Sequence, residues 1–229
     1  LVVTTKALKH QGGVLKENIQ KESLETMKKG FSNLEAHLEN MSKFTKNIVV
    51  ALNRYPTDTE DEINLIKQMV QEKGFAFSGF SSYQEGGEGA ISLAKEVINL
   101  CKNKKDFHLL YSSKMSLYQK IEVLSREIYH ATSISISDSI RKKLQTYEEM
   151  GYQDFPICVA KTQYSISDNP KLLGYPKDYE LVVSDVNIYT GAKFVVVYLG
   201  KIVTMPGLSK NPNYEQIDID NNNQIKGLF

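Results

Sequence analysis

The sequence predicts an α/β protein in which a parallel-sheet domain is followed by a smaller α+β domain. Three observations support this fold class. Strand and helix signals alternate over residues 1–102, which is typical of a parallel sheet with crossover helices. The composition becomes polar and charged around 103–106, and after Gly151 strand-like runs follow one another. We therefore expect one domain at 1–102 and a second at 103–229.

The first domain is expected to alternate short apolar strands with helices. The β-branched and apolar runs predict strands at 1–5, 47–52 and 75–77. Helical signals cover 15–29, 31–41, 60–73 and 88–101. Gly30 is expected to separate the first two helices, and Gly74 to end the third. Thr59 and Glu62 have the spacing of a capping box at the start of the third helix.

The second domain is expected to begin with two helices and to continue with strands. The helices are predicted at 117–129 and 137–150, the second with Ser137 as its N-cap. The strands are predicted at 157–161, 179–189, 194–199 and 201–204. The short step at Gly200 favours a hairpin, so we expect an antiparallel or mixed sheet here.

The composition argues against several classes of partner. Lys and Arg number 28 against 27 Asp and Glu, so no strong field would attract nucleic acid or an anionic membrane surface. No apolar stretch approaches the roughly 20 residues that cross a bilayer, and no signal sequence is recognised, so we expect a cytoplasmic protein. Cys101 and Cys158 lie in no metal-binding or redox spacing, and both are interpreted as buried thiols.

Two loops are candidate binding sites because ligands bind at the carboxyl ends of parallel strands. The first loop spans 53–59 and follows a predicted buried strand, and the second spans 81–89 and is rich in glycine. On pattern alone, half-buried packing at strand ends is the favoured interpretation of Tyr55 and Tyr83, and Asp58 is compatible with a helix cap. The glycines at 86–89 lack the Lys-Ser/Thr of a phosphate-binding loop and favour a tight turn.

Outside these loops, the sequence offers little catalytic chemistry. The polar run 161–165 follows a predicted strand and is a further candidate site loop. The four histidines are scattered without metal spacing, and no Gly-x-Ser-x-Gly motif indicates a nucleophile.

Several segments resemble conserved blocks of formate–tetrahydrofolate ligases, in the order in which that family has them. The matching segments are 3–13 (Val-Thr-Thr-Lys-Ala-Leu-Lys-His-Gln-Gly-Gly), 30–35, 53–59 (Asn-Arg-Tyr-Pro-Thr-Asp-Thr), 86–89 (Gly-Gly-Glu-Gly), 158–165 (Cys-Val-Ala-Lys-Thr-Gln-Tyr-Ser), 204–208 (Thr-Met-Pro-Gly-Leu) and 227–229 (Gly-Leu-Phe). The resemblance covers essentially the whole chain. The chain resembles the C-terminal part of these ligases.

The resemblance implies an ATP-driven ligase of one-carbon metabolism that formylates N10 of tetrahydrofolate. In the family, MgATP bound at a P-loop phosphorylates formate, and tetrahydrofolate attacks the formyl phosphate. The implied fold is the C-terminal portion of a P-loop NTPase-like domain followed by the smaller domain. Family members form homo-oligomers, and some are activated by a monovalent cation. No P-loop motif occurs in residues 1–229, so we expect a piece that begins within a domain and is inactive when isolated.

The resemblance also implies which residues bind folate. The family holds the pterin between two aromatic rings, and their positions match Tyr55 and Tyr83. The residues that follow the first ring are implied to face the pterin or the formyl-transfer site. They are Pro56, Thr57, Asp58 and Thr59.

Five residues depart from the family pattern, including Tyr55, where phenylalanine is common, and Lys193, which interrupts a stretch that is usually small and apolar. Lys6 stands where arginine is usual, Gln11 where histidine or asparagine is usual, and Tyr83 where tryptophan is usual. Lysine lacks the planar fork with which arginine binds carboxylates and phosphates. An alternative is therefore a noncatalytic homologue that binds folate or acts as a scaffold. A P-loop upstream of Leu1 in the parent reading frame would favour the enzyme.

Overall fold

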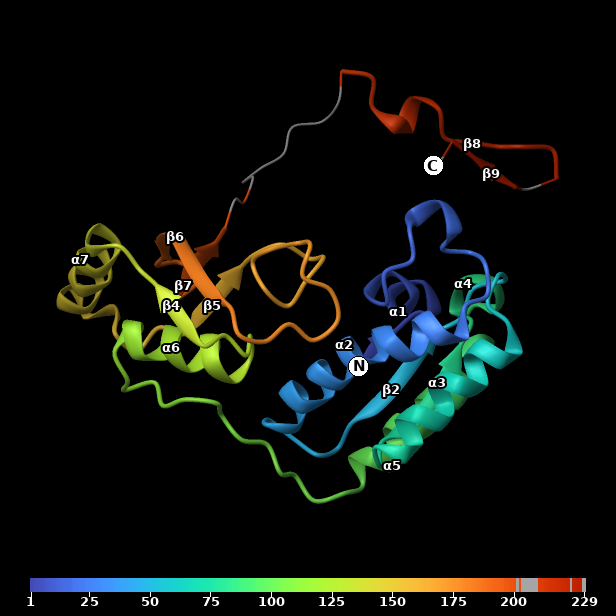
Figure 1. The fold of residues 1–229 in the computed structure, drawn as a ribbon, viewed down its shortest axis with the longest axis horizontal. Coiled ribbons are helices and arrows are strands. Elements are labelled where there is room, and N and C mark those ends of the chain that lie inside the picture. The colour runs from blue at the N-terminus through green and yellow to red at the C-terminus, as the bar shows by residue number, and fades with distance from the viewer. Residues whose placement is uncertain (201, 203–209, 223, 228–229) are drawn as a thin grey trace.

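The structure is a computed structural model that describes residues 1–200, 202, 210–222 and 224–227. Figure 1 shows two bodies joined by an extended stretch after helix α5. Each body has its own buried apolar cluster, the first drawn from residues between Val3 and Val70 and the second from residues between Leu117 and Leu199. The division into domains at 1–102 and 103–229 remains a proposal.

The first body is built on a parallel sheet with the strand order β1-β2-β3. Its strands are β1 (Val2–Val3), β2 (Val49–Asn53) and β3 (Ala76–Phe80). Val2 pairs with Ala51 and Asn53 pairs with Phe80, both in parallel register. The predicted α/β class with a parallel sheet is confirmed, whereas the P-loop NTPase-like description remains a prediction.

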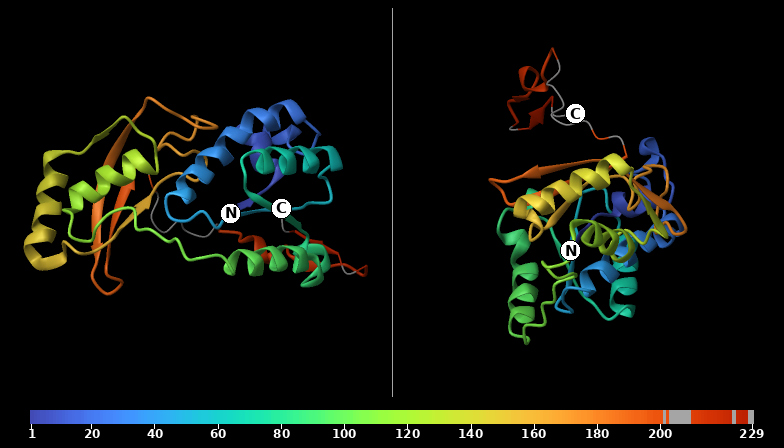
Figure 2. Two further views of the ribbon diagram at one scale, coloured as in Figure 1. Left: turned by 90° about the horizontal axis from the view of Figure 1, so that it is seen from below. Right: turned by 90° about the vertical axis from the view of Figure 1, so that its left-hand side faces the viewer.

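Helices cover this sheet. They are α1 (Thr5–Gln11), α2 (Leu24–Ser42), α3 (Glu60–Glu72), the short α4 (Ser82–Glu85) and α5 (Ile91–Cys101), with 3-10 turns at Lys16–Asn18 and Glu88–Ala90. Phe31, Leu34 and Leu38 are buried along α2, as their helical spacing predicts. Helix α5 contacts β2 and β3 and lies on the other side of the sheet from α2 (Figure 2). None of its residues is buried.

The second body contains a mixed sheet with the strand order β4-β6-β7-β5. The strands are β4 (Ser133–Ser135), β5 (Ile157–Ala160), β6 (Glu180–Tyr189) and β7 (Phe194–Leu199). Strands β6 and β7 pair antiparallel, and the other pairs are parallel, which confirms the predicted mixed sheet. Helices α6 (Leu117–Glu127) and α7 (Asp138–Tyr147) precede most of it, and a π-helical turn follows at Glu148–Tyr152.

The remaining elements lie near the C-terminus. They are a 3-10 turn at Asn213–Glu215 and the antiparallel pair β8 (Asp218–Ile219) and β9 (Ile225–Lys226). The strand expected at 201–204, and with it the hairpin at Gly200, falls largely on residues outside those that the structure describes.

Local predictions at helix ends are mostly confirmed. Thr59 and Glu62 form the predicted capping box of α3, and Ser137 caps α7 by accepting a hydrogen bond from the Ile140 N–H. Gly74 ends α3 with a φ of 81°, a backbone conformation that favours glycine.

Two predictions at the start of the chain are wrong. The strand expected at 1–5 ends at Val3, because the Thr4 hydroxyl accepts a hydrogen bond from the Ala7 N–H at 3.0 Å and so starts a helix at Thr5. Gly30 does not interrupt the helix, since α2 begins at Leu24 and continues through it. Gly30 instead permits close packing on α1, because a Cβ atom there would lie 1.9 Å from the Leu8 carbonyl oxygen.

The prediction of buried cysteines is also wrong, because both thiols are exposed. Cys101 is the last residue of α5, and no residue of that helix is buried. Cys158 lies on β5, which is an edge strand of its sheet. An apolar run predicts a strand, but the covered faces of that strand depend on what packs against it.

Candidate functional site

The candidate site lies at the carboxyl edge of the first sheet, where the loops after β2 and β3 emerge. Because β2 and β3 are parallel neighbours, both loops leave the sheet on the same side. The first loop carries Tyr55 and the second carries Tyr83. Tyr55 is 40% exposed and Tyr83 is 83% exposed, so both rings are open to solvent at this edge. Half-buried packing, the simpler interpretation of a tyrosine at a strand end, does not describe Tyr83.

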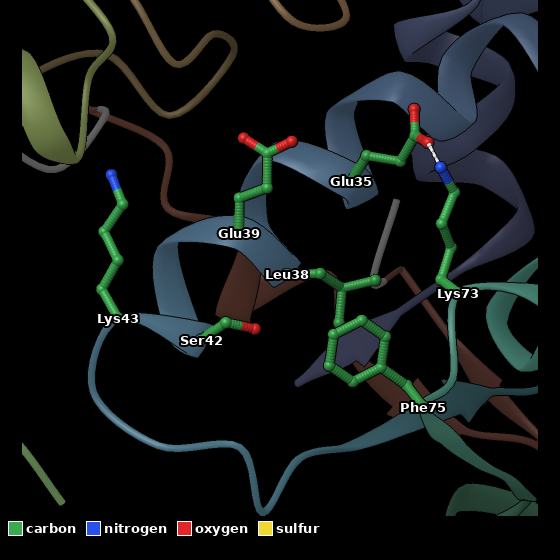
Figure 3. Close-up of a pocket in the computed structure, with 7 residues that line it drawn as sticks. All are labelled: Glu35, Leu38, Glu39, Ser42, Lys43, Lys73 and Phe75. Atoms are coloured by element: carbon green, nitrogen blue, oxygen red, sulfur yellow. Dashed lines mark ion pairs between the residues drawn. The ribbon is translucent and has the colours of Figure 1, made fainter.

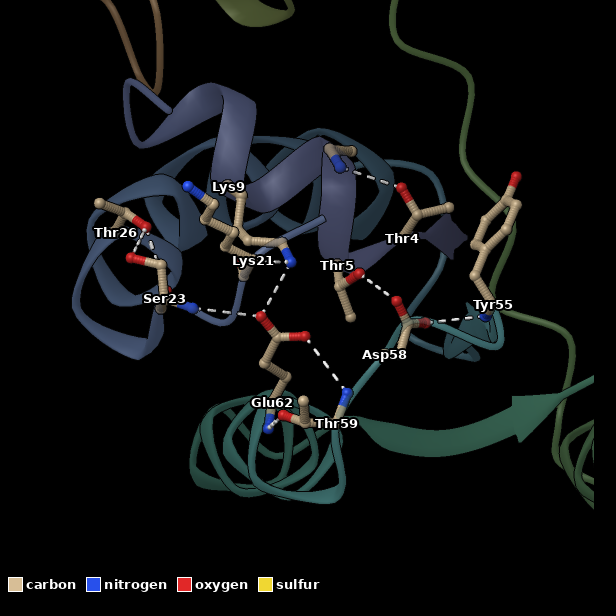
Figure 4. Close-up of polar contacts among 11 residues, drawn as sticks. Thr4, Thr5, Lys9, Lys21, Ser23, Thr26, Tyr55, Asp58, Thr59 and Glu62 are labelled. Atoms are coloured by element: carbon tan, nitrogen blue, oxygen red, sulfur yellow. Dashed lines mark hydrogen bonds and ion pairs between the residues drawn. The ribbon is translucent and has the colours of Figure 1, made fainter. Parts of the chain in front are cut away.

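Asp58 holds the first loop in place through both carboxylate oxygens (Figure 4). Oδ1 accepts a hydrogen bond from the buried Thr5 hydroxyl at 2.5 Å, and Oδ2 accepts one from the Tyr55 N–H at 2.8 Å. The Asp58 N–H in turn donates to the Tyr55 carbonyl oxygen at 3.0 Å. Asp58 therefore fixes the backbone of Tyr55 and ties this loop to the start of α1.

A buried ion pair lies directly beneath the loop. Lys9 Nζ is 2.9 Å from Glu62 Oε1, and the two side chains are 1% and 0% exposed. Glu62 also accepts hydrogen bonds from the Ser23 N–H at 3.3 Å and the Thr59 N–H at 3.4 Å. The pair thus joins α1, the start of α3 and the chain before α2 (Figure 4). Only the role of Glu62 as the N3 residue of the capping box was predictable from the sequence, and its pairing with Lys9 was not.

The other predicted residues of this loop either lie on the surface or cap helix α3. Pro56 and Thr57 are exposed, whereas the Thr59 hydroxyl accepts a hydrogen bond from the Glu62 N–H at 3.3 Å. Lys6 lies over the loop, with Nζ 4.2 Å from the centre of the Tyr55 ring. This cation–π contact was not foreseen from the sequence, which gave no reason to pair α1 with this tyrosine.

The second loop is closed on itself. Tyr83 lies in α4, and the Ser81 N–H donates to the Gly89 carbonyl oxygen at 3.0 Å. A Cβ atom at Gly89 would lie 2.8 Å from the Ser81 backbone, and Gly86 has a φ of 58°. Both glycines are therefore needed by the turn, which supports the interpretation of 86–89 as a tight turn.

The polar run 161–165 lies apart from this edge and contacts the first body through Gln11. The Gln11 side chain donates to the Tyr164 carbonyl oxygen at 3.1 Å and accepts from the Gly174 N–H at 2.8 Å. Gln11 thus links α1 to the second body. Two of the departures from the family pattern thus have different contacts: Lys6 contacts the Tyr55 ring, and Gln11 contacts the second body.

A hollow of about 380 Å³ between α2 and the start of β3 is a poor candidate for a charged ligand (Figure 3). Its charged residues are already engaged within the protein. Lys73 forms an ion pair with Glu35, and Lys43 Nζ lies 3.0 Å from a carboxylate oxygen of Glu127. Glu39 accepts a hydrogen bond from the Tyr175 hydroxyl. The apolar wall is formed by Leu38 and Phe75.

Among the residues that the structure describes, no group of three or more His, Cys, Asp or Glu side chains is arranged to hold a metal ion. No helix in these ranges has both the length and the apolar character that crossing a bilayer requires.

Comparison with known proteins relates the whole chain to one family. The sequence model of the formate–tetrahydrofolate ligase family matches residues 1–229. A formate–tetrahydrofolate ligase of Kosmotoga olearia is 43% identical over 230 aligned residues, which cover 100% of this chain and 41% of that protein. The chain therefore spans less than half the length of this relative.

Proposed function

The chain belongs to the formate–tetrahydrofolate ligase family, and on this basis we propose that it supplies the tetrahydrofolate site of such a ligase. The enzyme would use ATP to activate formate as formyl phosphate and would transfer the formyl group to N10 of tetrahydrofolate. One observation carries the assignment of the site. Two solvent-open tyrosines, Tyr55 and Tyr83, leave the carboxyl edge of neighbouring parallel strands.

An aromatic pair at this edge suits a flat heterocycle. Tyrosine rings bind a planar ring by stacking, and each contributes roughly 1–3 kcal/mol. Asp58 holds the backbone of Tyr55 by accepting a hydrogen bond from its N–H. Asp58 is in turn held by a hydrogen bond from the Thr5 hydroxyl. A loop that is already ordered loses less entropy when a ligand binds. We propose that Asp58 acts on folate through the position of Tyr55, because it accepts a hydrogen bond from the Tyr55 N–H and is itself held by the Thr5 hydroxyl.

The phosphoryl chemistry is assigned to residues outside this chain. Phosphoryl transfer depends on a phosphate-cradling loop, its lysine and Mg²⁺, and residues 1–229 contain no P-loop motif. The proposed contribution of this chain is to bind and orient tetrahydrofolate.

Substitution of Tyr83 in the full-length protein tests the site. Loss of one stacking ring predicts that Tyr83→Ala weakens tetrahydrofolate binding about 5- to 150-fold. Tyr83→Trp, which restores the larger ring usual in the family, should bind tetrahydrofolate at least as tightly as the parent. Isothermal titration of tetrahydrofolate measures each affinity.

Tyr214→Ala is the matched control, because Tyr214 is also an exposed tyrosine, at 70%, and lies outside the proposed site. Its affinity should equal that of the parent. An unchanged affinity in Tyr83→Ala would show that this tyrosine does not bind the pterin, and the assignment of the site would be wrong.

A further inference from the structure

We propose that the hollow between the two bodies is a second binding site, for a small anion that carries an aromatic or apolar group. The hollow has a volume of about 500 Å³ and is bordered by α2, by the end of α6 and by the loop 161–166. Ligand pockets in proteins fall in this size range, and they often lie between domains. This proposal is independent of the proposed folate site.

The charges around this hollow favour an anion. Lys161 and His37 both line it, and no Asp or Glu side chain is among the described residues that do. Lys161 Nζ donates to the carbonyl oxygens of Thr162, at 2.8 Å, and Ser165. An ammonium group has three donors, so these two bonds hold it at the wall and leave one donor for a ligand.

The remaining wall suits an apolar group on the same ligand. Phe44 and Met41 border the hollow from the end of α2, and Leu124, Ile128 and Tyr129 border it from α6 and the residues that follow. Tyr129 also faces the Lys161 ammonium, which lies 5.7 Å from the centre of its ring. A ligand with its anion at Lys161 and an aromatic body against Phe44 or Tyr129 would use both parts of the wall.

The protein does not fully compensate the positive charge at this wall. Burial lowers the pKa of Lys161 to about 8, and Asp168 opposes this only in part. His37 is partly open to solvent, but desolvation by the surrounding wall, and then the positive charge of Lys161, lower its pKa, so the free imidazole is largely neutral at pH 7. A bound anion would favour the charged form of both groups. An anion bound in this hollow would therefore supply the missing negative charge. Around the hollow in Figure 3, by contrast, Lys43 and Lys73 already form ion pairs with carboxylates.

The position of the hollow separates it from the tyrosines. Leu1, at the start of β1, lines it, as do residues of the second half of α2, which leads back to the amino end of β2. Tyr55 and Tyr83 follow the carboxyl ends of β2 and β3. The two sites thus lie at opposite edges of the first sheet, and a ligand at one does not occupy the other.

Phenyl phosphate tests this proposal, because it joins a dianion to an aromatic ring. Isothermal titration into the full-length protein at pH 7 should show binding that is stronger than that of inorganic phosphate or phenol. His37→Gln should weaken the binding of phenyl phosphate about 5-fold or more, because the bound dianion favours the protonated imidazole and the variant loses that charge-assisted contact. His37 is exposed on α2, so this variant should fold normally. His108→Gln is the matched control, because His108 is also exposed and does not itself line the hollow, and this variant should bind as the parent does.

The pH dependence provides a second measurement. Binding should weaken between pH 7 and pH 9 as Lys161 loses its proton, and Lys161→Gln should bind weakly at both values. The groups that face Lys161 are His37, Asp168 and Tyr129.

Three results would overturn the proposal. They are no binding to the full-length protein, equal affinity in His37→Gln and the parent, and competition between phenyl phosphate and tetrahydrofolate that Tyr83→Ala abolishes. The last result would place phenyl phosphate in the folate site. Failure of the Tyr83 experiment alone would leave this site unaffected, because none of its wall includes that tyrosine.

Discussion

Replacement of Lys9 by methionine should destabilise the protein strongly, although Lys9 touches no proposed ligand. Lys9 Nζ lies 2.9 Å from Glu62 Oε1, and the two side chains are 1% and 0% exposed. Methionine has a similar length and fills the same space, so little cavity would form. The main effect would be an uncompensated carboxylate in the interior.

The magnitude follows from what remains around Glu62. Without Lys9, its carboxylate would keep two long hydrogen bonds, from Ser23 N–H at 3.3 Å and Thr59 N–H at 3.4 Å. Removing one partner of a buried ion pair costs about 3–5 kcal/mol. Replacing both partners by apolar residues of similar volume is often neutral, so Lys9→Met with Glu62→Met should be more stable than Lys9→Met alone.

Guanidinium unfolding of the parent, each single variant and the double variant measures these free energies as a double-mutant cycle. Lys28→Met is the control, because the Lys28–Glu25 pair is 51% and 87% exposed and should contribute less than about 1 kcal/mol. If Lys9→Met costs less than about 1 kcal/mol, or if the double variant loses more than the sum of the singles, the pair does not stabilise the protein as we infer.

Two further predictions concern the same region. Gly30→Ala should destabilise the protein by about 1–3 kcal/mol or more in guanidinium unfolding, because its Cβ would lie 1.9 Å from the Leu8 carbonyl oxygen, whereas Gly191→Ala meets no atom within 4 Å and should be nearly neutral. An equal effect of both would contradict the close packing of α1 on α2. Thr5→Val removes the hydroxyl that binds Asp58 at 2.5 Å, so isothermal titration should show weaker tetrahydrofolate binding, and Thr5→Ser should restore it. Full affinity in Thr5→Val would show that this hydrogen bond does not position Tyr55.

The fold was largely predictable because its signals are local. The alternation of apolar strands and helices over 1–102 predicted the parallel sheet, and the spacing of Phe31, Leu34 and Leu38 predicted the buried face of α2. Gly30 shows where local signals fail. A helix interior disfavours glycine, so the sequence suggested a break, yet the approach of Leu8 from another helix makes glycine necessary there.

The candidate site was predictable only in part. Parallel strand order placed the loops of Tyr55 and Tyr83 at one edge, which topology alone implies. The contacts of Lys6 with Tyr55, of Thr5 with Asp58 and of Lys9 with Glu62 were not foreseen. Each joins α1 to a segment about fifty residues later, and no local pattern encodes such a pairing.

These contacts divide the residues of the 55–59 loop into two roles. The Tyr55 ring is solvent-open, whereas the side-chain oxygens of Asp58 and Thr59 accept hydrogen bonds from within the protein. The polar side chains of this loop hold its own conformation, so the loop presents to a ligand mainly the face of the Tyr55 ring and an ordered backbone. Recognition at this edge would then depend on stacking, with polar selectivity supplied by groups outside the loop. Lys6 of α1 is one such group, with its Nζ 4.2 Å from the centre of the Tyr55 ring.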